Sequence, residues 1–127
     1  MEVINVIVAA AAAYGFGAAW YMTLAKPWIA GAGVTEEQVK SGSKAPYAVS
    51  FVMLLIVAGM MRHIFALGGI DTLGKGLMSG IGLGLFIVAP WIVTNYAYSM
   101  RPLQLTVIDC GYAVGGCTVI GIVLTLF

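Results

Sequence analysis

Residues 103–127 decide the fold; they read LQLTVIDCGYAVGGCTVIGIVLTLF and contain only one charged side chain. A helix needs about 20 mostly apolar residues to cross the hydrocarbon core of a bilayer. Three further stretches of this kind lie at residues 3–24, 47–67 and 73–98. Because lipid offers the backbone no hydrogen-bond partner, each stretch is expected to be helical. The sequence therefore predicts an all-α membrane bundle of four transmembrane helices, in a single domain over residues 1–127.

The composition of the chain supports a membrane location. Of the 127 residues, 61% are hydrophobic and 9% are charged, and the mean hydropathy is +1.02. A soluble domain carries about 25% charged residues, and a chain this short has too much surface to hide its apolar side chains from water. The lipid bilayer is therefore the expected partner of most of the surface. A formal net charge of +1 argues against a nucleic-acid partner.

Lysine and arginine residues predict how the chain is oriented. No lysine or arginine precedes the first apolar stretch, which is therefore expected to be a retained span and not a signal peptide. The basic residues divide unequally, and the side that carries more of them is normally cytoplasmic. We expect both termini outside, because four basic residues lie on one side and two on the other: Lys26, Lys40, Lys44 and Arg101 against Arg62 and Lys75.

The long loop between the first two spans contains the sequence Thr35-Glu36-Glu37-Gln38. Threonine followed three residues later by glutamine is a capping box, in which each side chain bonds the backbone amide of the other residue. The pattern predicts one short interfacial helix from Glu36 to about Ser41.

Polar side chains are expected to gather near one end of the bundle. An ionisable side chain inside a span is costly, so Asp109 raises a functional question. Helical spacing places Tyr112 on the same face, and the third span, with a kink predicted at Pro90, returns to the same surface. The predicted intramembrane cluster consists of Asp109, Asn95, Tyr98, Arg101, Tyr112 and Tyr21.

Two interpretations of this cluster are open. In the first, Arg101 and the phenols satisfy Asp109 and fix how the last two spans pack, as a hydrogen-bonded clasp. In the second, the cluster is a proton or cation site at the mouth of a pathway. Deeper in the membrane, between residue 73 and Pro90, the third span is mostly Gly, Leu and Ile. This apolar composition favours the clasp, because a transport route would continue polar across the membrane.

The arginine, the histidine and the cysteines within the spans predict no ion pair, metal site or disulfide. Arg62 lies on the order of 13 Å from Asp109 along the membrane normal, so we expect it to extend toward the headgroups instead of forming an ion pair. His63 has no second histidine and no carboxylate at ligand spacing, and no metal site is expected. Cys110 and Cys117 are seven residues apart on one helix, too far to form a disulfide, and are interpreted as packing residues.

Glycines recur at four-residue spacing in the last two spans. Small residues at this spacing let helix backbones approach closely. We expect Gly111 and Gly115 to pack inside the bundle. The longer run of Gly76, Gly80 and Gly84 suits either the bundle or a second subunit.

Motifs spread over nearly the whole chain resemble a known family. The first half contains Gly17-Ala18-Ala19-Trp20-Tyr21, Lys26-Pro27-Trp28 and Gly33-Val34-Thr35-Glu36-Glu37, and the second half Thr94-Asn95-Tyr96, Arg101 and Ile108-Asp109-Cys110-Gly111-Tyr112. Together these motifs resemble the bacterial family called domain of unknown function 1761. The resemblance implies a small four-span inner-membrane protein. It implies no activity, substrate or cofactor, so no functional residue is carried over; Cys110 departs from the alanine expected there.

The sequence favours a protein that works through helix contacts. It contains no nucleotide-binding loop, no metal-ligand cluster and no nucleophile beside a base. No cofactor, no metal and no enzymatic activity are therefore expected. The leading hypothesis is a non-enzymatic membrane protein that forms a homo-oligomer or a small subunit of a larger membrane complex. The alternative is a small oligomeric channel or transporter for a proton, ion or small solute, with its polar site near Asp109.

Overall fold

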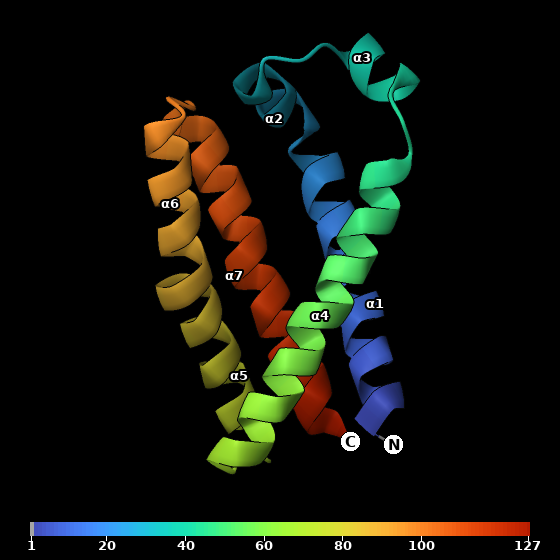
Figure 1. Ribbon diagram of the computed structural model, residues 1–127, viewed down its shortest axis with the longest axis vertical. Helices are drawn as coiled ribbons and strands as arrows, with labels where there is room; N and C mark the ends of the chain where they lie inside the picture. The colour runs from blue at the N-terminus through green and yellow to red at the C-terminus, as the bar shows by residue number, and fades with distance from the viewer. Residues whose placement is uncertain (1) are drawn as a thin grey trace.

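Four long helical stretches run between two sets of short loops in the computed structural model, which describes residues 2–127 (Figure 1). Each is long and apolar enough to cross a membrane, which confirms the predicted fold class. The third stretch contains a π-helical turn, η1, between α5 and α6. The elements are α1 (Glu2–Thr23), α2 (Ala25–Ala32), α3 (Glu36–Ser41), α4 (Ala45–Gly68), α5 (Leu73–Leu83), η1 (Gly84–Val88), α6 (Ala89–Tyr98) and α7 (Leu103–Leu126).

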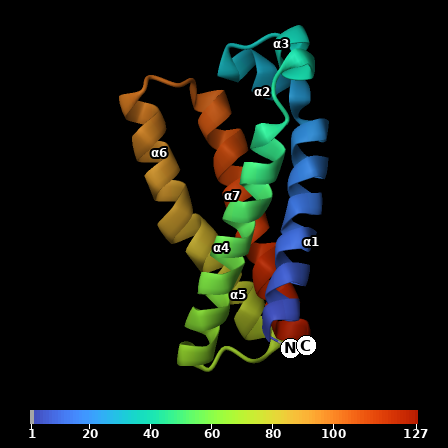
Figure 2. The ribbon, with the colours of Figure 1, turned by 45° about the vertical axis from the view of Figure 1, so that its right-hand side comes forward.

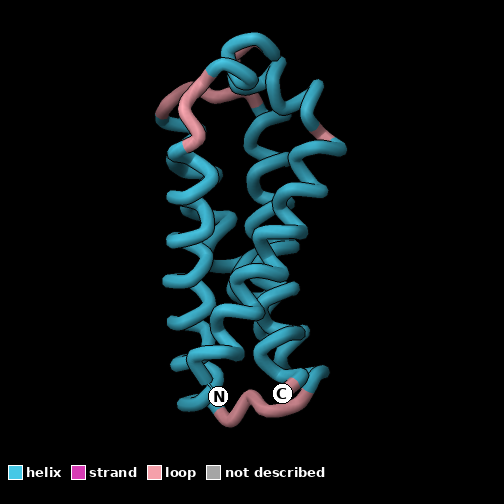
Figure 3. The backbone as a smooth tube through the Cα atoms, turned by 90° about the vertical axis from the view of Figure 1, so that its right-hand side faces the viewer, coloured by secondary structure: helices cyan, strands magenta, loops and turns pink. Residues whose placement is uncertain are grey.

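The loops lie at the two ends of the bundle (Figure 3). We call the end that carries α2, α3 and the 99–102 turn the upper end. The lower end carries the 69–72 turn and both ends of the described chain (Figure 1). At the upper end the Thr35 hydroxyl accepts from the Gln38 amide and the Gln38 side chain accepts from the Thr35 amide, as the capping box predicts. The preceding helix α2 was not expected. It ends at Ala32 and is capped by Gly33, whose φ of +75° suits a residue without a Cβ.

Helix α7 is the central element, because α1, α2, α5, η1 and α6 all pack against it. The closest approach is to α5, through glycines on both helices. A methyl group at Gly80 would lie 2.5 Å from the Cys117 carbonyl oxygen, and one at Gly84 would lie 2.6 Å from Val114 Cα. Gly76 contacts Gly121 in the same way. The glycine run of the third span therefore faces α7 of its own chain.

Two glycines of α7, Gly111 and Gly115, let aromatic rings of α1 approach the α7 backbone. A methyl group at Gly111 would lie 2.5 Å from the Trp20 ring, and Gly115 faces Phe16. The Trp20 indole N–H also donates to the Ile108 carbonyl at 2.9 Å. Gly111 and Gly115 thus pack within the bundle.

The hydrophobic core lies in the lower half of the bundle, where α1, α4 and α7 meet. Three alanines of α1 pack against mostly larger residues of the other two helices: Ala9, Ala10 and Ala13 against Leu54, Ala58, Met61, Phe65, Cys117, Ile120 and Leu124. In the upper half, residues 45–49 of α4 are exposed. Figure 2 shows α6 standing apart from α7 toward its upper end. The upper half buries fewer apolar side chains than the lower half, among them Leu105 and Ile108 of α7.

The π-turn η1 occupies the position just before Pro90, where the sequence predicts a kink. Proline has no N–H to donate to the carbonyl four residues earlier. At Ala89, the residue before Pro90, the N–H donates to the Gly84 carbonyl, five residues back instead of four. This turn adds one residue to the helix and so changes which side chains of α6 face α7.

Candidate functional site

Asp109 on α7 accepts hydrogen bonds from two phenols, one on each side. The Tyr21 Oη of α1 lies 2.5 Å from Asp109 Oδ1, and the Tyr96 Oη of α6 lies 2.5 Å from Oδ2. Hydrogen bonds from a hydroxyl to a carboxylate are short and stronger than neutral ones. A single carboxyl group therefore ties the first and third spans to the fourth. We call Asp109, Tyr21, Tyr96 and Tyr112 the acid–phenol cluster.

Tyr112 joins this cluster through its ring. The centres of the Tyr112 and Tyr21 rings are 5.2 Å apart, and the Phe16 ring lies nearly parallel to Tyr112 at 6.4 Å. Gly17 makes room for it, since a methyl group there would lie 2.6 Å from the Tyr112 ring. Aromatic packing thus fixes the orientation of Tyr21, the phenol that donates to Asp109.

Arg101 lies beside the cluster but does not form an ion pair with Asp109. Its guanidinium carbon is 5.9 Å from the centre of the Tyr96 ring, a cation–π distance. Among residues 2–127 the one ion pair within 4.0 Å joins Lys75 to Asp71, in an exposed turn. In the described chain, Asp109 therefore has neutral hydrogen-bond donors and no basic partner in contact.

Asn95 and Tyr98 do not join the cluster; both are exposed, Tyr98 to 87%. The expectation rests on the helical spacing of Trp91, Asn95 and Tyr98, which puts them on one face of the third span. In a regular α-helix this face would also continue the face that carries the glycine run. The extra residue in η1 moves that face by one position, so Ala89 is buried and Tyr96 approaches α7. Sequence reasoning missed Tyr96, and the signal for it is the proline that accompanies the π-turn.

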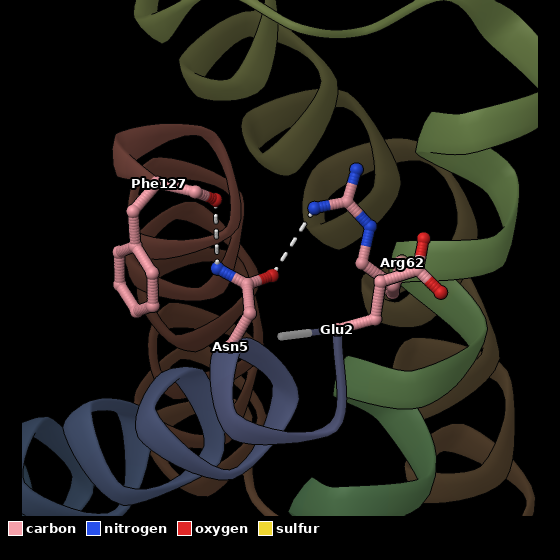
Figure 4. A pocket seen from close by; sticks show the side chains of 4 residues that line it. All are labelled: Glu2, Asn5, Arg62 and Phe127. Carbon is pink, nitrogen blue, oxygen red and sulfur yellow. Dashed lines mark hydrogen bonds between the residues drawn. The ribbon is translucent and has the colours of Figure 1, made fainter.

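A second polar contact lies at the lower end (Figure 4). Arg62 Nη1 donates to Asn5 Oδ1 at 3.1 Å and to the Leu124 carbonyl at 3.0 Å. The Asn5 amide nitrogen bonds the Val123 and Phe127 carbonyls at 3.4 and 3.3 Å. Arg62 therefore turns into the bundle, and the expectation that it extends toward the headgroups is wrong. Sequence reasoning also missed Asn5, which is only 2% exposed.

A small cavity adjoins this contact. Its volume is about 70 Å³, and Glu2, Asn5, Arg62 and Phe127 line it (Figure 4). The Arg62 Nε atom is buried and has no hydrogen-bond partner among the described residues. This volume exceeds the minimum of about 10–15 Å³ that a cavity needs to hold one water molecule. The lower contact therefore joins α1, α4 and α7 around one guanidinium.

The described residues contain no group of three or more His, Cys, Asp or Glu side chains placed to hold a metal ion. Cys117 is buried in the core. Cys110 Sγ lies 3.7 Å from the Ala89 carbonyl oxygen, at the upper end of the π-turn. Both cysteines are free thiols that contact neighbouring helices.

Comparison with known proteins assigns the chain to a family but not to an activity. No curated protein and no solved structure matches it. A family model described as "Protein of unknown function (DUF1761)" matches residues 4–125, which confirms the resemblance stated above. The matched region includes the acid–phenol cluster and the contact between Asn5 and Arg62. With a match over nearly its whole length, this four-helix chain belongs to the DUF1761 family of proteins of unknown function.

Proposed function

We propose that this protein is a non-enzymatic membrane channel or transporter in which Asp109 binds and releases a proton or another small cation. The observation that carries the proposal is the environment of Asp109. Both of its carboxylate oxygens accept from neutral phenols, and no lysine or arginine of the described chain contacts it. A carboxylate within a span is costly unless a positive charge is near. A bound proton or cation supplies that charge.

A purely structural clasp predicts a different arrangement. Stability alone is served by a direct ion pair between Asp109 and Arg101, which lies in the adjacent turn. Instead, Arg101 stacks on Tyr96 and leaves the carboxylate free to change its charge.

The proposal includes a homo-oligomer. The acid–phenol cluster lies in the upper half and the Asn5–Arg62 contact at the lower end, and the apolar core lies between them. A polar route across the membrane therefore needs a second copy of the chain. Since the run from Gly76 to Gly84 faces α7 of its own chain, the copies associate through another face.

A second candidate function is a small subunit of a larger membrane complex that acts through helix contacts. The outer face of the third span favours it, because large side chains there have no neighbour within the chain. Phe86 is 72% exposed and Trp91 is 68% exposed. Lipid or another membrane subunit covers such a face.

We further propose that the protein resides in a bacterial inner membrane with its upper end in the cytoplasm. Lys26, Lys40, Lys44 and Arg101 lie at or beside the upper loops. At the lower end Arg62 is directed into the bundle, which leaves Lys75 as the exposed basic side chain there. The side richer in lysine and arginine is normally cytoplasmic, which puts both termini outside.

Proton flux into liposomes tests the leading proposal. The purified protein is reconstituted with a pH-sensitive dye inside, and a potassium diffusion potential drives proton entry. We expect Asp109→Asn to abolish the flux. The matched control is Asp71→Asn, which removes an exposed acid at the lower end and is expected to leave the flux unchanged.

The native mass after mild extraction separates the two candidate functions. A particle of small multiples of 13.3 kDa plus lipid supports an autonomous oligomer. A larger particle with stoichiometric partners, combined with a flux that does not depend on Asp109, contradicts the transport proposal and favours the subunit.

A further inference from the structure

We infer that residues 84–90 form a hinge, and that the Tyr96–Asp109 hydrogen bond is the latch that holds α6 against α7. The inference rests on the proposed function in one respect, that Asp109 changes its protonation state. It adds a moving element, the upper part of the third span, and a residue that controls it, Tyr96.

The regular ladder of helical hydrogen bonds is interrupted at two positions of the hinge. The Ala89 N–H reaches the Gly84 carbonyl five residues back, and Pro90 has no N–H for the Phe86 carbonyl. A helix bends most readily where its backbone ladder is interrupted in this way. Single π-turns inside α-helices are frequent at functional sites.

The packing of the third span changes at this segment. Below it, α5 is fixed on α7 by direct backbone contact, because methyl groups at Gly76 or Gly80 would collide with α7. Above it, residues 91–98 include no fully buried side chain, and only Ile92 and Tyr96 are half-buried. Figure 2 shows the upper end of α6 standing apart from α7. The hinge therefore separates an anchored segment from a weakly held one.

The latch is one hydrogen bond. Tyr96 Oη donates to Asp109 Oδ2, and it is the one side chain of α6 that hydrogen-bonds to another helix within the described chain. Thr94 and Ser99 donate to carbonyls of their own helix, those of Pro90 and Asn95. Releasing the Tyr96 phenol therefore releases the upper end of α6.

The charge of Asp109 sets the strength of the latch. A carboxylate is a strong acceptor for a phenol, and a neutral carboxyl group is a weaker one. A proton that arrives from water at the upper end adds to the carboxylate, while the phenol keeps its own proton. The groups that face Asp109 are Tyr21 from α1, Tyr96 from α6 with Arg101 over its ring, and Tyr112 and Cys110 from α7.

The expected consequence is that protonation loosens α6 and opens the Asp109 side of the bundle. Ionisation brings α6 back onto α7. If the site opens in one charge state and closes in the other, the binding of a proton to Asp109 controls whether Asp109 can be reached from water at the upper end. This coupling is the property that distinguishes a carrier from a fixed polar pore.

Distance measurements between spin labels test the hinge. Labels are placed at exposed positions of α6 and α4, Ala97→Cys and Val49→Cys, in a background with both native cysteines replaced by alanine. In lipid nanodiscs we expect Tyr96→Phe and Asp109→Asn each to lengthen and broaden the distance distribution. Tyr98→Phe, an exposed neighbour, is the control and is expected to change nothing. An unchanged distribution in either Tyr96→Phe or Asp109→Asn overturns the latch.

A second measurement avoids variants that fail to fold. Hydrogen exchange of the unaltered protein in nanodiscs is compared at acidic and neutral pH, after correction for the intrinsic pH dependence of exchange. We expect protection over residues 91–98 to fall on acidification and protection over residues 76–83 to stay constant. Equal protection of residues 91–98 at both pH values overturns the hinge. Neither experiment measures flux. A flux that does not depend on Asp109 therefore rejects the proposed function, whereas the label distances and the hydrogen exchange test the hinge alone.

Discussion

The Tyr96 phenol lies 2.5 Å from the Asp109 carboxylate, thirteen residues further along the chain, and closes the hairpin of the last two spans. The turn between them contains Met100 with a positive φ of 57°, a conformation uncommon outside glycine. The hairpin is therefore held at its upper end by a strained turn and one hydrogen bond, and at its lower end by glycine packing. This difference between its two ends leads to the first three predictions.

Replacing Tyr96 with phenylalanine removes the phenol while keeping the ring. We expect the free energy of unfolding to fall by about 1.5–3 kcal/mol, the range for a hydrogen bond to a charged group. Thermal unfolding in a mild detergent measures the change. Tyr98→Phe is the matched control, since this side chain is 87% exposed, and its effect is expected within about 0.5 kcal/mol.

Removing the carboxyl group of Asp109 leaves two half-buried phenols without their acceptor. We expect Asp109→Ala to destabilise the protein by about 1–3 kcal/mol for each unpaired group. Asp109→Asn keeps one acceptor oxygen and is expected to cost less. An unaltered melting temperature for Asp109→Ala would show that the two hydrogen bonds do not stabilise the bundle.

Enlarging Gly80 tests the backbone contact between α5 and α7. A methyl group there would lie 2.5 Å from the Cys117 carbonyl oxygen, so we expect Gly80→Ala to destabilise the fold by about 1–3 kcal/mol. Gly82→Ala meets nothing within 4 Å and is expected to be neutral or to stabilise the helix by up to about 1 kcal/mol. Equal melting temperatures for the two variants would contradict the packing described here.

The contact between Asn5 and Arg62 links the first two spans at the lower end. We expect Asn5→Ala to lower the free energy of unfolding by about 1–3 kcal/mol, because Arg62 loses a buried acceptor. A double-mutant cycle with Arg62→Leu measures the coupling between the two side chains. His63→Ala alters the exposed neighbour of Arg62 and is expected to have no measurable effect. A coupling energy near zero means that the two side chains do not depend on each other.

The sequence predicts the spans well, since their length and apolarity follow from the bilayer itself. Residues 73–98, expected as one stretch, are one stretch in the structure, and the capping box at Thr35 forms as its residue spacing predicts. These features depend on local composition and on hydrogen bonds within four residues of each other. Neither requires knowledge of how one helix is rotated against another.

The contacts between spans were harder to predict, because they depend on rotation and depth. Tyr21 and Asp109 both belong to the predicted cluster, and they do meet. Tyr96 was missed because one extra residue in η1 rotates α6. Asn5 was missed because a lone amide in an apolar stretch gives no sign of its partner on another helix.

The one-residue excess of η1 also matters for how relatives of this chain are aligned. A homologue whose third span is regular α-helix throughout reaches the same acid with one residue fewer between Gly84 and the phenol. An ungapped alignment would then pair the tyrosine of that homologue with Asn95. Allowing a single gap within residues 84–89 would restore the correspondence and would separate relatives with a π-turn from those without one.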